Sequence, residues 1–263
     1  MPLIEANDIV LEYKLDGPEG GAPLVLLHEL GGSIESWGAL ISNLQQAGHR
    51  VLRWNWRGTG ASEKIRGDLG VDTMCADLAA LMEALSFPHP ADVAGTALGG
   101  GIALAFAARY PTKVRRLAVS SPAIGGMSGI EAMLRARADD VEQNGMRGEV
   151  DNSLSRSYPV KYRTNLEAFT AYRNRWVAND PGSYASHNRM LAGMDERPNL
   201  AKIACPTIVL AGKDDRLLVP AAMKEIADAI PGAAFQELPT GHFLPVNTPI
   251  LWAEAVLPWL EGA

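Results

Sequence analysis

The stretch that decides the fold covers residues 91–106 and reads ADVAGTALGGGIALAF. A short run at 92–94 is followed at once by Gly95 and Gly99, and small apolar residues with helical spacing continue from 100 to 108. A strand that turns sharply into a helix between two such glycines is the G-x-S-x-G arrangement, which holds a serine exposed above a sheet. The glycines are required because a side chain at either position would collide with the flanking strand or helix. In this chain Ala97 stands where the serine is expected.

The alanine at position 97 governs what chemistry the chain can perform. A methyl group cannot attack a carbonyl, so an acyl-enzyme formed through Ala97 is excluded for the chain as written. Turns of this kind hold their central residue in a strained backbone conformation that costs about 1–3 kcal/mol, and glycine would relieve that strain. The retained β-carbon therefore favours a serine-to-alanine change in an otherwise working enzyme. A natural enzyme or binding protein that dispenses with the serine is the alternative.

Composition and charge restrict the class of protein. The chain has 263 residues, of which 47% are hydrophobic and 21% charged, as expected for one soluble α/β domain with an insertion or at most two small domains. A net charge of -6 gives no basic surface for nucleic acid or for an anionic membrane. The sequence predicts no bound cofactor and no metal site, and it leaves open whether the chain forms a homodimer.

Cysteine content and the N-terminus bear on location. Cys75 and Cys205 are the two cysteines, and their unrelated positions favour free thiols in a reducing compartment over a disulfide. We see no secretory signal and no run of 18 apolar residues that could span a membrane. A cytoplasmic location is therefore expected.

The order of apolar runs predicts a doubly wound, mostly parallel sheet. Helices with one apolar face separate short buried strands, which is the pattern of an α/β fold. The expected strands are 9–15, 24–28, 50–54, 92–94, 114–120, 206–211 and 233–238. From 123 to 199 the pattern changes to helices without a buried strand, with many arginines. We therefore expect residues 1–122 and 200–263 to form the core and 123–199 to form an inserted helical cap.

An acidic residue and a histidine follow the later strands. Asp214 and Asp215 come directly after the run at 206–211, and His242 comes after the next expected strand. The carboxyl ends of parallel strands meet at one edge of a sheet, so these side chains are expected to converge on position 97. The chain order of nucleophile position, acid and histidine is that of G-x-S-x-G hydrolases. The spacing favours Asp215 as the acid, with Asp214 as its rival.

These motifs together resemble the α/β-hydrolase superfamily along nearly the whole chain. A His-x-x-Gly type loop begins at His28, and an Arg-Gly-x-Gly-x-Ser loop covers 57–62. The stretches 180–184 and 205–209 are most similar to the capped branch that contains 3-oxoadipate enol-lactonases and neighbouring C–C bond hydrolases. That branch degrades small carboxylated products of aromatic ring breakdown. The resemblance departs at Ala97 and at Glu29, where glycine is common.

The resemblance implies a role for each site residue. Ala97 occupies the nucleophile position, His242 would accept and return the nucleophile's proton, and Asp215 would hold the imidazole. The backbone N–H groups of Leu30 and Leu98 would form the oxyanion hole.

For the residues that could contact the substrate, the sequence leaves alternatives open. Glu29 would either contact the substrate or point to solvent, while Trp37, Trp176 and Met133 would line the pocket or pack in the core. The cap arginines are expected mostly on a solvated face, with one or two turned inward to bind a carboxylate. Those arginines are Arg135, Arg137, Arg173, Arg175 and Arg189. We single out Arg173 as the candidate ligand.

The sequence thus predicts a cofactor-free hydrolase whose partner is a small, carboxylated acyl substrate. The bond cleaved would be a lactone, ester, amide or C–C bond, and the chain with Ala97 would be inactive. Two alternatives stay open. A His–Asp pair can abstract a proton without any nucleophile, as in cofactor-independent dioxygenases and lyases of this fold. The pocket could also serve a binding protein without catalytic activity.

Overall fold

The protein is described here by a computed structural model that covers residues 2–126 and 129–262. Within these residues the strands form one sheet of eight in the order β1-β2-β4-β3-β5-β6-β7-β8. The strands are β1 (Leu3–Ala6), β2 (Ile9–Asp16), β3 (Ala22–Leu27), β4 (His49–Asn55), β5 (Ala91–Thr96), β6 (Val114–Ser120), β7 (Thr207–Gly212) and β8 (Ala234–Leu238).

Only the β1–β2 and β2–β4 pairs are antiparallel, and the remaining pairs are parallel. This confirms the predicted mostly parallel, doubly wound sheet. In the registered pairs, Leu27 lies opposite Gly95, and Thr96 lies opposite Ser120, which itself lies opposite Leu210. The carboxyl ends of β3, β5, β6 and β7 therefore meet at one edge, which is where residues that follow these strands are brought together.

Both faces of the sheet are covered by helices because the central strands bury side chains in both directions. Leu24 and Leu26 of β3 belong to one apolar cluster with η1 (Ile34–Leu40), α1 (Ile41–Gln46) and α10 (Pro249–Glu261). Val25 and Leu27 belong to a second cluster on the opposite face. Alternate residues of a strand point to opposite faces, so a fully apolar run such as 24–27 requires cover on both sides. The helices that contribute to the second cluster include α2 (Val71–Ala84), α3 (Leu98–Arg109) and α8 (Pro220–Asp228).

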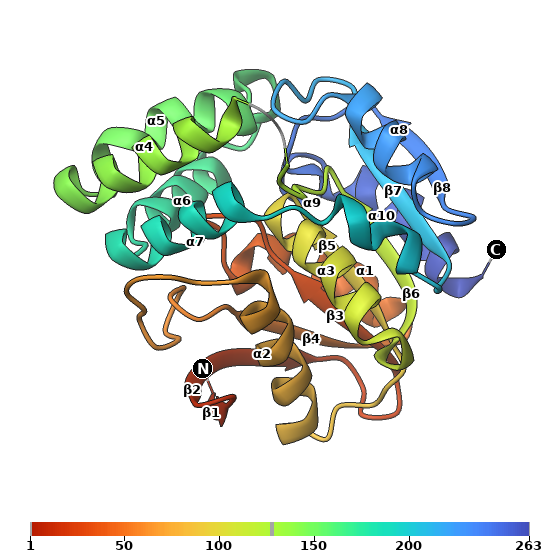
Figure 1. The fold of residues 1–263 in the computed structure, drawn as a ribbon. Helices are drawn as coiled ribbons and strands as arrows, with labels where there is room; N and C mark the ends of the chain where they lie inside the picture. Colours follow the sequence, from red (N-terminus) through yellow and green to blue (C-terminus); the bar gives the residue numbers. More distant parts are fainter. Residues whose placement is uncertain (1, 127–128, 263) are drawn as a thin grey trace.

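Residues 123–199 contain helices but no strand in the part that the structure describes. Figure 1 shows these helices grouped at one end of the molecule, beside the carboxyl edge of the sheet. They are α4 (Ile130–Asn144), α5 (Met146–Ser157), α6 (Leu166–Val177) and α7 (Pro181–Gly193). A third apolar cluster joins them to Ala97 and to Phe243, which lies in the short segment before α9 (Leu244–Asn247). The helical segment thus closes over the end of the sheet where Ala97 lies.

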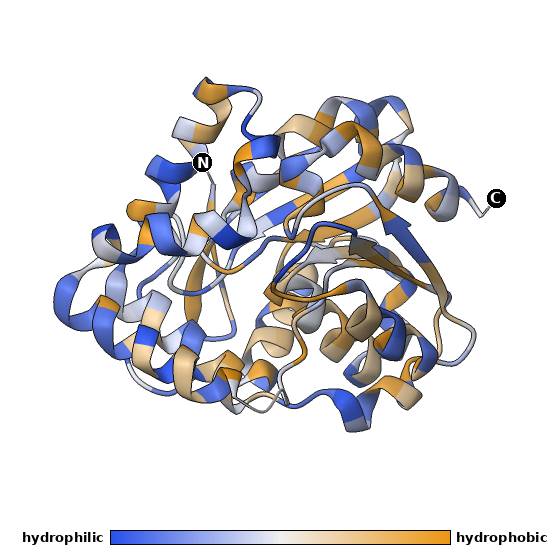
Figure 2. Ribbon diagram, turned by 90° about the horizontal axis from the view of Figure 1, so that it is seen from above, coloured by the Kyte–Doolittle hydropathy of each residue, from blue (hydrophilic) through white to orange (hydrophobic). Residues whose placement is uncertain are grey.

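Hydropathy along the ribbon follows this layered arrangement. Figure 2 shows hydrophobic residues concentrated in the central strands, whereas the outer helices alternate between hydrophobic and hydrophilic positions. None of the helices in the described ranges is long and apolar enough to cross a membrane.

Candidate active site

Ala97 lies at the turn between β5 and α3 in a backbone conformation that side chains rarely adopt. Its φ is 51° and its ψ is -120°, a combination that is costly for a residue with a β-carbon. A β-carbon on Gly95 would lie 2.4 Å from the carbonyl oxygen of Gly99. One on Gly99 would lie 2.2 Å from the carbonyl oxygen of His28. Both glycines are therefore required by close backbone contacts, as the sequence predicted.

Backbone hydrogen bonds hold Ala97 in this conformation. Its N–H donates to the carbonyl of Ser120 at 2.9 Å, and its own carbonyl accepts from Gly101 at 3.0 Å and Ala123 at 2.9 Å. These partners belong to α3 and to the end of β6 with the loop that follows it, so two segments of the chain fix the turn. Ala97 is only 3% exposed to solvent.

Asp215 and His242 form a buried pair beyond the ends of β7 and β8. His242 Nδ1 lies 2.7 Å from Asp215 Oδ2. The other carboxylate oxygen accepts the N–H groups of Leu217 at 2.8 Å and Leu218 at 2.9 Å. Burial raises the pKa of Asp215, but the charge of His242 and the hydrogen bonds to the carboxylate outweigh it, so the pKa is lowered. The carboxylate is thus held in its ionised form beside the imidazole.

Asp214 lies outside this pair. Its carboxylate contacts Lys161 and Tyr162 at the surface, and its side chain is 38% exposed. The hydrogen bond from Lys161 lowers the pKa of Asp214. The structure therefore places Asp215, and not its neighbour, next to His242.

The turn after β3 lies against the start of α3. His28 is stacked on Trp56 with a 4.0 Å separation between ring centroids, and burial lowers the pKa of His28 to about 3. His28 therefore stays neutral below this turn. Leu30 is half-buried in the same apolar cluster as Ala97, and Leu98 begins α3, where the first N–H groups have no intrahelical acceptor.

Glu29 is neither exposed to solvent nor turned to the surface of the cavity described below. It is fully buried, and its Oε1 accepts hydrogen bonds from Ser36 Oγ at 2.7 Å and from the Tyr172 hydroxyl at 2.8 Å. Burial raises the pKa of Glu29, and these hydrogen bonds offset the rise only in part. Glu29 was expected either to contact the substrate or to point to solvent. It does not point to solvent and does not line the cavity, because the turn folds around its carboxyl group.

The two tryptophans singled out from the sequence lie in different places. Trp176 belongs to the cluster that contains Ala97, and its indole nitrogen lies over Gly31, where a β-carbon would be only 2.4 Å away. Trp37 packs edge-on against Trp252 with a 5.2 Å centroid distance, in the cluster under the opposite face of the sheet. The prediction that Trp37 lines the pocket is corrected: its helical face points to the core.

Most of the cap arginines point outward, as expected, and pair with acidic side chains. Arg173 pairs with Asp151 at 2.9 Å on the surface, so its prediction as a substrate ligand is corrected. Arg135 pairs with Glu131 at 3.0 Å and Arg189 with Glu142 at 2.5 Å. The two remaining cap arginines have no such surface ion pair with any described residue. Arg175 lies half-buried with its guanidinium 5.9 Å from the Tyr172 ring centroid, and Arg137 lines a cavity.

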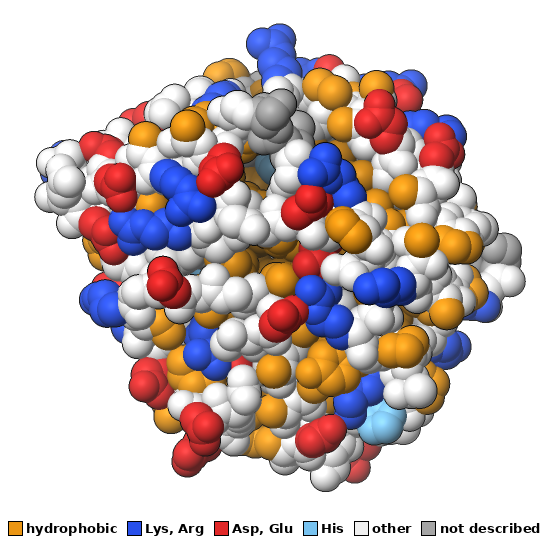
Figure 3. All heavy atoms as spheres, viewed as in Figure 1, with side chains coloured by type: hydrophobic (Ala, Val, Ile, Leu, Met, Phe, Trp, Pro, Cys, Tyr) orange, Lys and Arg blue, Asp and Glu red, His pale blue; other side chains and the backbone are white. Residues whose placement is uncertain are grey.

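A cavity of about 470 Å³ opens between α4, the end of α7 and the loop before α8. Ala123 and Leu218 both line it, and their N–H groups bond to Ala97 and to Asp215 respectively. The cavity therefore adjoins the backbone around position 97 and the loop of Asp215, but Ala97, Asp215 and His242 are not among the residues that line it. Figure 3 shows this face hollowed, with a small area of histidine surface inside the hollow. In the described parts of the chain, no group of His, Cys, Asp and Glu is arranged to bind a metal ion.

Comparison with known proteins fits this geometry. The family described as "alpha/beta hydrolase fold" matches residues 22–249. The chain belongs to the alpha/beta hydrolase fold family. A protein from Azorhizobium caulinodans named as a carbamate hydrolase, RutD, is 29% identical over 98% of this chain and 97% of its own length. The 3-oxoadipate enol-lactonase 2 of Acinetobacter baylyi is 25% identical over 96% of this chain and 94% of its own.

A solved enol-lactonase structure has the same fold as this chain. The crystal structure of the enol-lactonase from Burkholderia xenovorans LB400 superposes with a TM-score of 0.93 and 28% identity, covering 99% of this chain and 100% of that one. The resemblance to the enol-lactonase branch that the sequence motifs indicated is therefore confirmed.

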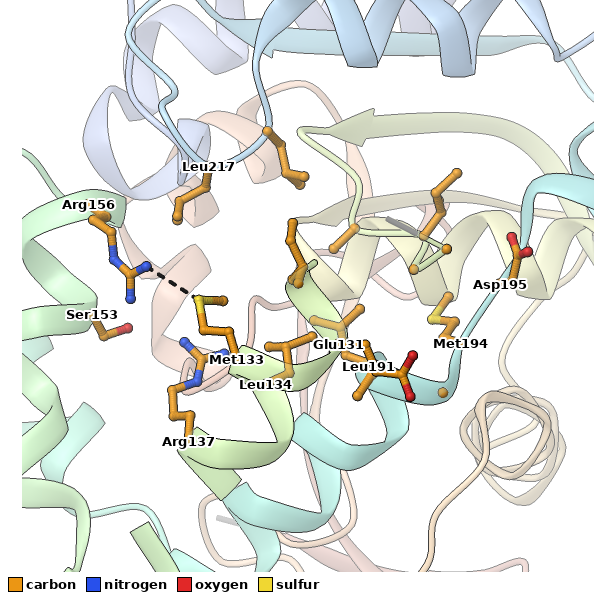
Figure 4. Close-up of a pocket in the computed structure, with 18 residues that line it drawn as sticks. Glu131, Met133, Leu134, Arg137, Ser153, Arg156, Leu191, Met194, Asp195 and Leu217 are labelled. Atoms are coloured by element: carbon orange, nitrogen blue, oxygen red, sulfur yellow. Dashed lines mark hydrogen bonds between the residues drawn. The ribbon is translucent and has the colours of Figure 1, made fainter. Parts of the chain in front are cut away.

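The cavity of this alpha/beta hydrolase contains a cation that the sequence analysis missed. Arg156 of α5 lines the cavity, and its Nη1 lies 3.7 Å from Met133 Sδ. Among the described residues it has no acidic partner, and its buried Nε has no hydrogen-bond partner. Figure 4 shows Arg156 and Arg137 beside Met133, with Leu217 across the cavity. Helix α5 carries few apolar residues, so its inward face gave no clear signal in the sequence.

Arg137 is the second cation of the cavity. Its Nε donates to Asn188 Oδ1 at 2.7 Å, and its Nη1 is 3.9 Å from Glu149 Oε1. This long contact leaves most of the guanidinium donors uncommitted. Tyr172, also missed, could have been found from its spacing, because it lies four residues before Trp176 on one face of α6.

Proposed function

We propose that the site around position 97 is that of a hydrolase for small acyl compounds, and that the chain with Ala97 is a form that lacks only the nucleophile. The observation that carries the proposal is the 2.7 Å contact between His242 Nδ1 and Asp215 Oδ2 at the sheet edge where the turn of Ala97 lies. The turn keeps its strained φ of 51° although no hydroxyl group is present to benefit from it. Such strain is useful when a nucleophile must be presented.

The proposed chemistry follows from the atoms in place. With serine at position 97, the unprotonated Nε2 of His242 accepts the hydroxyl proton while the oxygen attacks the substrate carbonyl. The Leu30 and Leu98 N–H groups stabilise the resulting oxyanion. The imidazolium, stabilised by Asp215, then gives its proton to the leaving group, and water repeats the sequence to release the acid.

The substrate class is proposed from the relatives and from the cavity. Relatives named as carbamate hydrolases and enol-lactonases act on small carbonyl compounds, which fits a cavity of about 470 Å³. Arg137 and Arg156 add two guanidinium groups to a mostly apolar lining, which also contains Glu131 and Asp195. Because these two carboxylates are paired with Arg135 and Arg197, the guanidinium groups are still suited to a carboxylate. Helices α4 to α7 would then serve as the cap that selects the substrate. The bond is a carbamate, lactone, ester, amide or activated C–C bond.

A second function is favoured by Ala97 itself. Asp215 and His242 are complete without position 97, and a His–Asp pair can remove a proton from a bound substrate with no covalent intermediate. A chain that carries alanine by nature would be an enzyme of this kind, such as a lyase or a cofactor-independent oxygenase.

The experiment that separates these functions is Ala97→Ser. Both forms are assayed with p-nitrophenyl acetate and with a panel of small lactones, carbamates and amides. The proposal expects the serine form to hydrolyse at least one of them about 10³-fold faster or more, because triad members act as a unit. A serine form that folds but is no faster than the alanine form on every compound would contradict the hydrolase and favour the nucleophile-free enzyme.

A further inference from the structure

One face of α6 lies on the turn that carries Leu30. The Tyr172 hydroxyl bonds to Glu29, the Trp176 indole lies over Gly31, and Asn179 Nδ2 donates to the Gly31 carbonyl at 3.0 Å. Residues 172, 176 and 179 are spaced by four and three, so they share one face of the helix and its end. A segment of the proposed cap is thus attached directly to the turn of the proposed oxyanion hole.

Glu29 is at the centre of this contact. Its carboxyl group fills the space that a β-carbon on Gly32 would need, since such an atom would lie 2.4 Å from Oε1. The turn is closed around it by the Gly32 N–H, which donates to the Glu29 carbonyl at 2.9 Å. Ser36 and Tyr172 both donate to Oε1, while Oε2 is buried with no hydrogen-bond partner among the described residues.

A buried carboxylate needs an ion pair with a cation or several hydrogen-bond donors. Glu29 has no ion pair among the described residues, and its side-chain donors all bind Oε1. The charged and titratable groups around it are Arg175, which is near but forms no ion pair with it among the described residues, the neutral His28 and the Tyr172 phenol. Its own backbone N–H also favours the ionised form, but an ionised group with two neutral side-chain donors on one oxygen and no hydrogen bond on the other is poorly compensated in an apolar interior. A neutral carboxylic acid, with its proton on Oε2, fits the contacts better.

We propose that Glu29 is the positioning residue of the oxyanion turn: a neutral carboxylic acid that fixes the Leu30 N–H relative to α6 through its hydrogen bond from Tyr172. This inference rests on the proposed function, because it assigns a purpose to the Leu30 N–H.

The kinetic test uses the Ala97→Ser form. Glu29→Gln keeps the shape and neutrality of the side chain and should retain kcat, whereas Glu29→Ala and Tyr172→Phe should each lower kcat by about tenfold or more with a smaller change in KM. The double variant should be no worse than either single one, because both remove the same link. Tyr110→Phe, a tyrosine that stacks on Phe106 away from this turn, is the control and should leave kcat unchanged.

A merely structural role for Glu29 would not give this pattern. It would lower the amount of folded protein and leave kcat per folded molecule unchanged in Glu29→Ala. Glu29→Gln as damaging as Glu29→Ala would show that the ionised form is needed. Either result overturns the proposal.

Two measurements on the chain with Ala97 test the same inference without any activity. The infrared spectrum at neutral pH should contain the C=O band of a protonated carboxylic acid that Glu29→Gln removes, and Tyr172→Phe should increase amide hydrogen exchange at residues 30–32 but not around Asp215. Absence of the band, or unchanged exchange in Tyr172→Phe, would contradict the inference. If the serine form has no hydrolase activity but both measurements succeed, the proposed function fails while the neutral Glu29 and its link to α6 remain.

Discussion

Asp215 binds His242 with one carboxylate oxygen and two backbone N–H groups with the other. The imidazole contact is 2.7 Å long, and the contacts from Leu217 and Leu218 are 2.8 Å and 2.9 Å. Because the carboxylate accepts at Nδ1, the imidazole carries its proton there, and Nε2 is the atom left free to accept one. The backbone of the loop after β7 therefore fixes the orientation of the histidine as well as the position of the acid.

This arrangement predicts unequal effects of two neighbouring substitutions. In the Ala97→Ser form, Asp215→Asn should lower kcat by about 10³-fold or more, because the amide favours the wrong imidazole tautomer. Asp214→Asn removes only a surface contact with Lys161 and Tyr162 and should change kcat less than about threefold. Steady-state kinetics on the best substrate of the panel measures both. The reverse ranking would show that the pair seen in the structure is not the catalytic one.

The strain at Ala97 predicts that removing a methyl group stabilises the fold. Ala97→Gly should raise the free energy of unfolding by about 1 kcal/mol, since glycine adopts a φ of 51° without steric cost. Ala103→Gly, at a fully buried position in the middle of α3, is the matched control and should lower the free energy of unfolding by about 1 kcal/mol. Urea denaturation gives both values. If the two changes have the same sign, the backbone of Ala97 is not strained.

Two buried histidines predict a loss of stability in mild acid. Burial lowers the pKa of His28 to about 3 and that of His187 to about 4, from the usual histidine value of 6.5. Below pH 6.5 the unfolded chain binds protons that the folded chain does not, so the stability present above pH 6.5 is lost as the pH falls toward these values.

The measurement is urea denaturation at about pH 7.5 and about pH 5.5, between which each histidine should cost about 1.4 kcal/mol. In His187→Gln, whose amide can still donate to the Arg57 carbonyl, the loss should be smaller by about that amount. His89→Gln changes an exposed residue and should leave the loss as it is. An unchanged loss in His187→Gln would mean that this histidine is protonated in the folded protein.

The cavity arginines predict how a carboxylated ligand binds. In the chain with Ala97, Arg156→Met should weaken the binding of a carboxylated substrate analogue by about tenfold or more and the binding of its methyl ester much less, because a half-buried cation is lost from one side of a charged pair. Arg173→Met changes an arginine that is paired with Asp151 at the surface. It should alter neither the affinity for the acid nor the affinity for the ester. Calorimetry with the acid and the ester gives the comparison. Equal losses for acid and ester would show that Arg156 acts by shape and not by charge.

Features set by local sequence were predicted well. The glycines at 95 and 99 specify a sharp turn because of backbone contacts that any side chain would break, and the apolar runs specify buried strands. The expected strand 114–120 coincides with β6. The order of position 97, Asp215 and His242 along alternating strands and helices also implied their convergence, because parallel strands end at one edge.

By itself, then, the sequence determined the sheet, the turn at Ala97 and the loops that carry the acid and the histidine. Only the tertiary structure decided which way long side chains point. Trp37 faces the core, Arg173 faces solvent and Arg156 faces the cavity. Helical spacing defines a face but not the element packed against it, and that choice depends on contacts between segments far apart in the chain. The hydrogen bond between Glu29 and Tyr172, separated by 143 residues, depends on such packing and has no local signal.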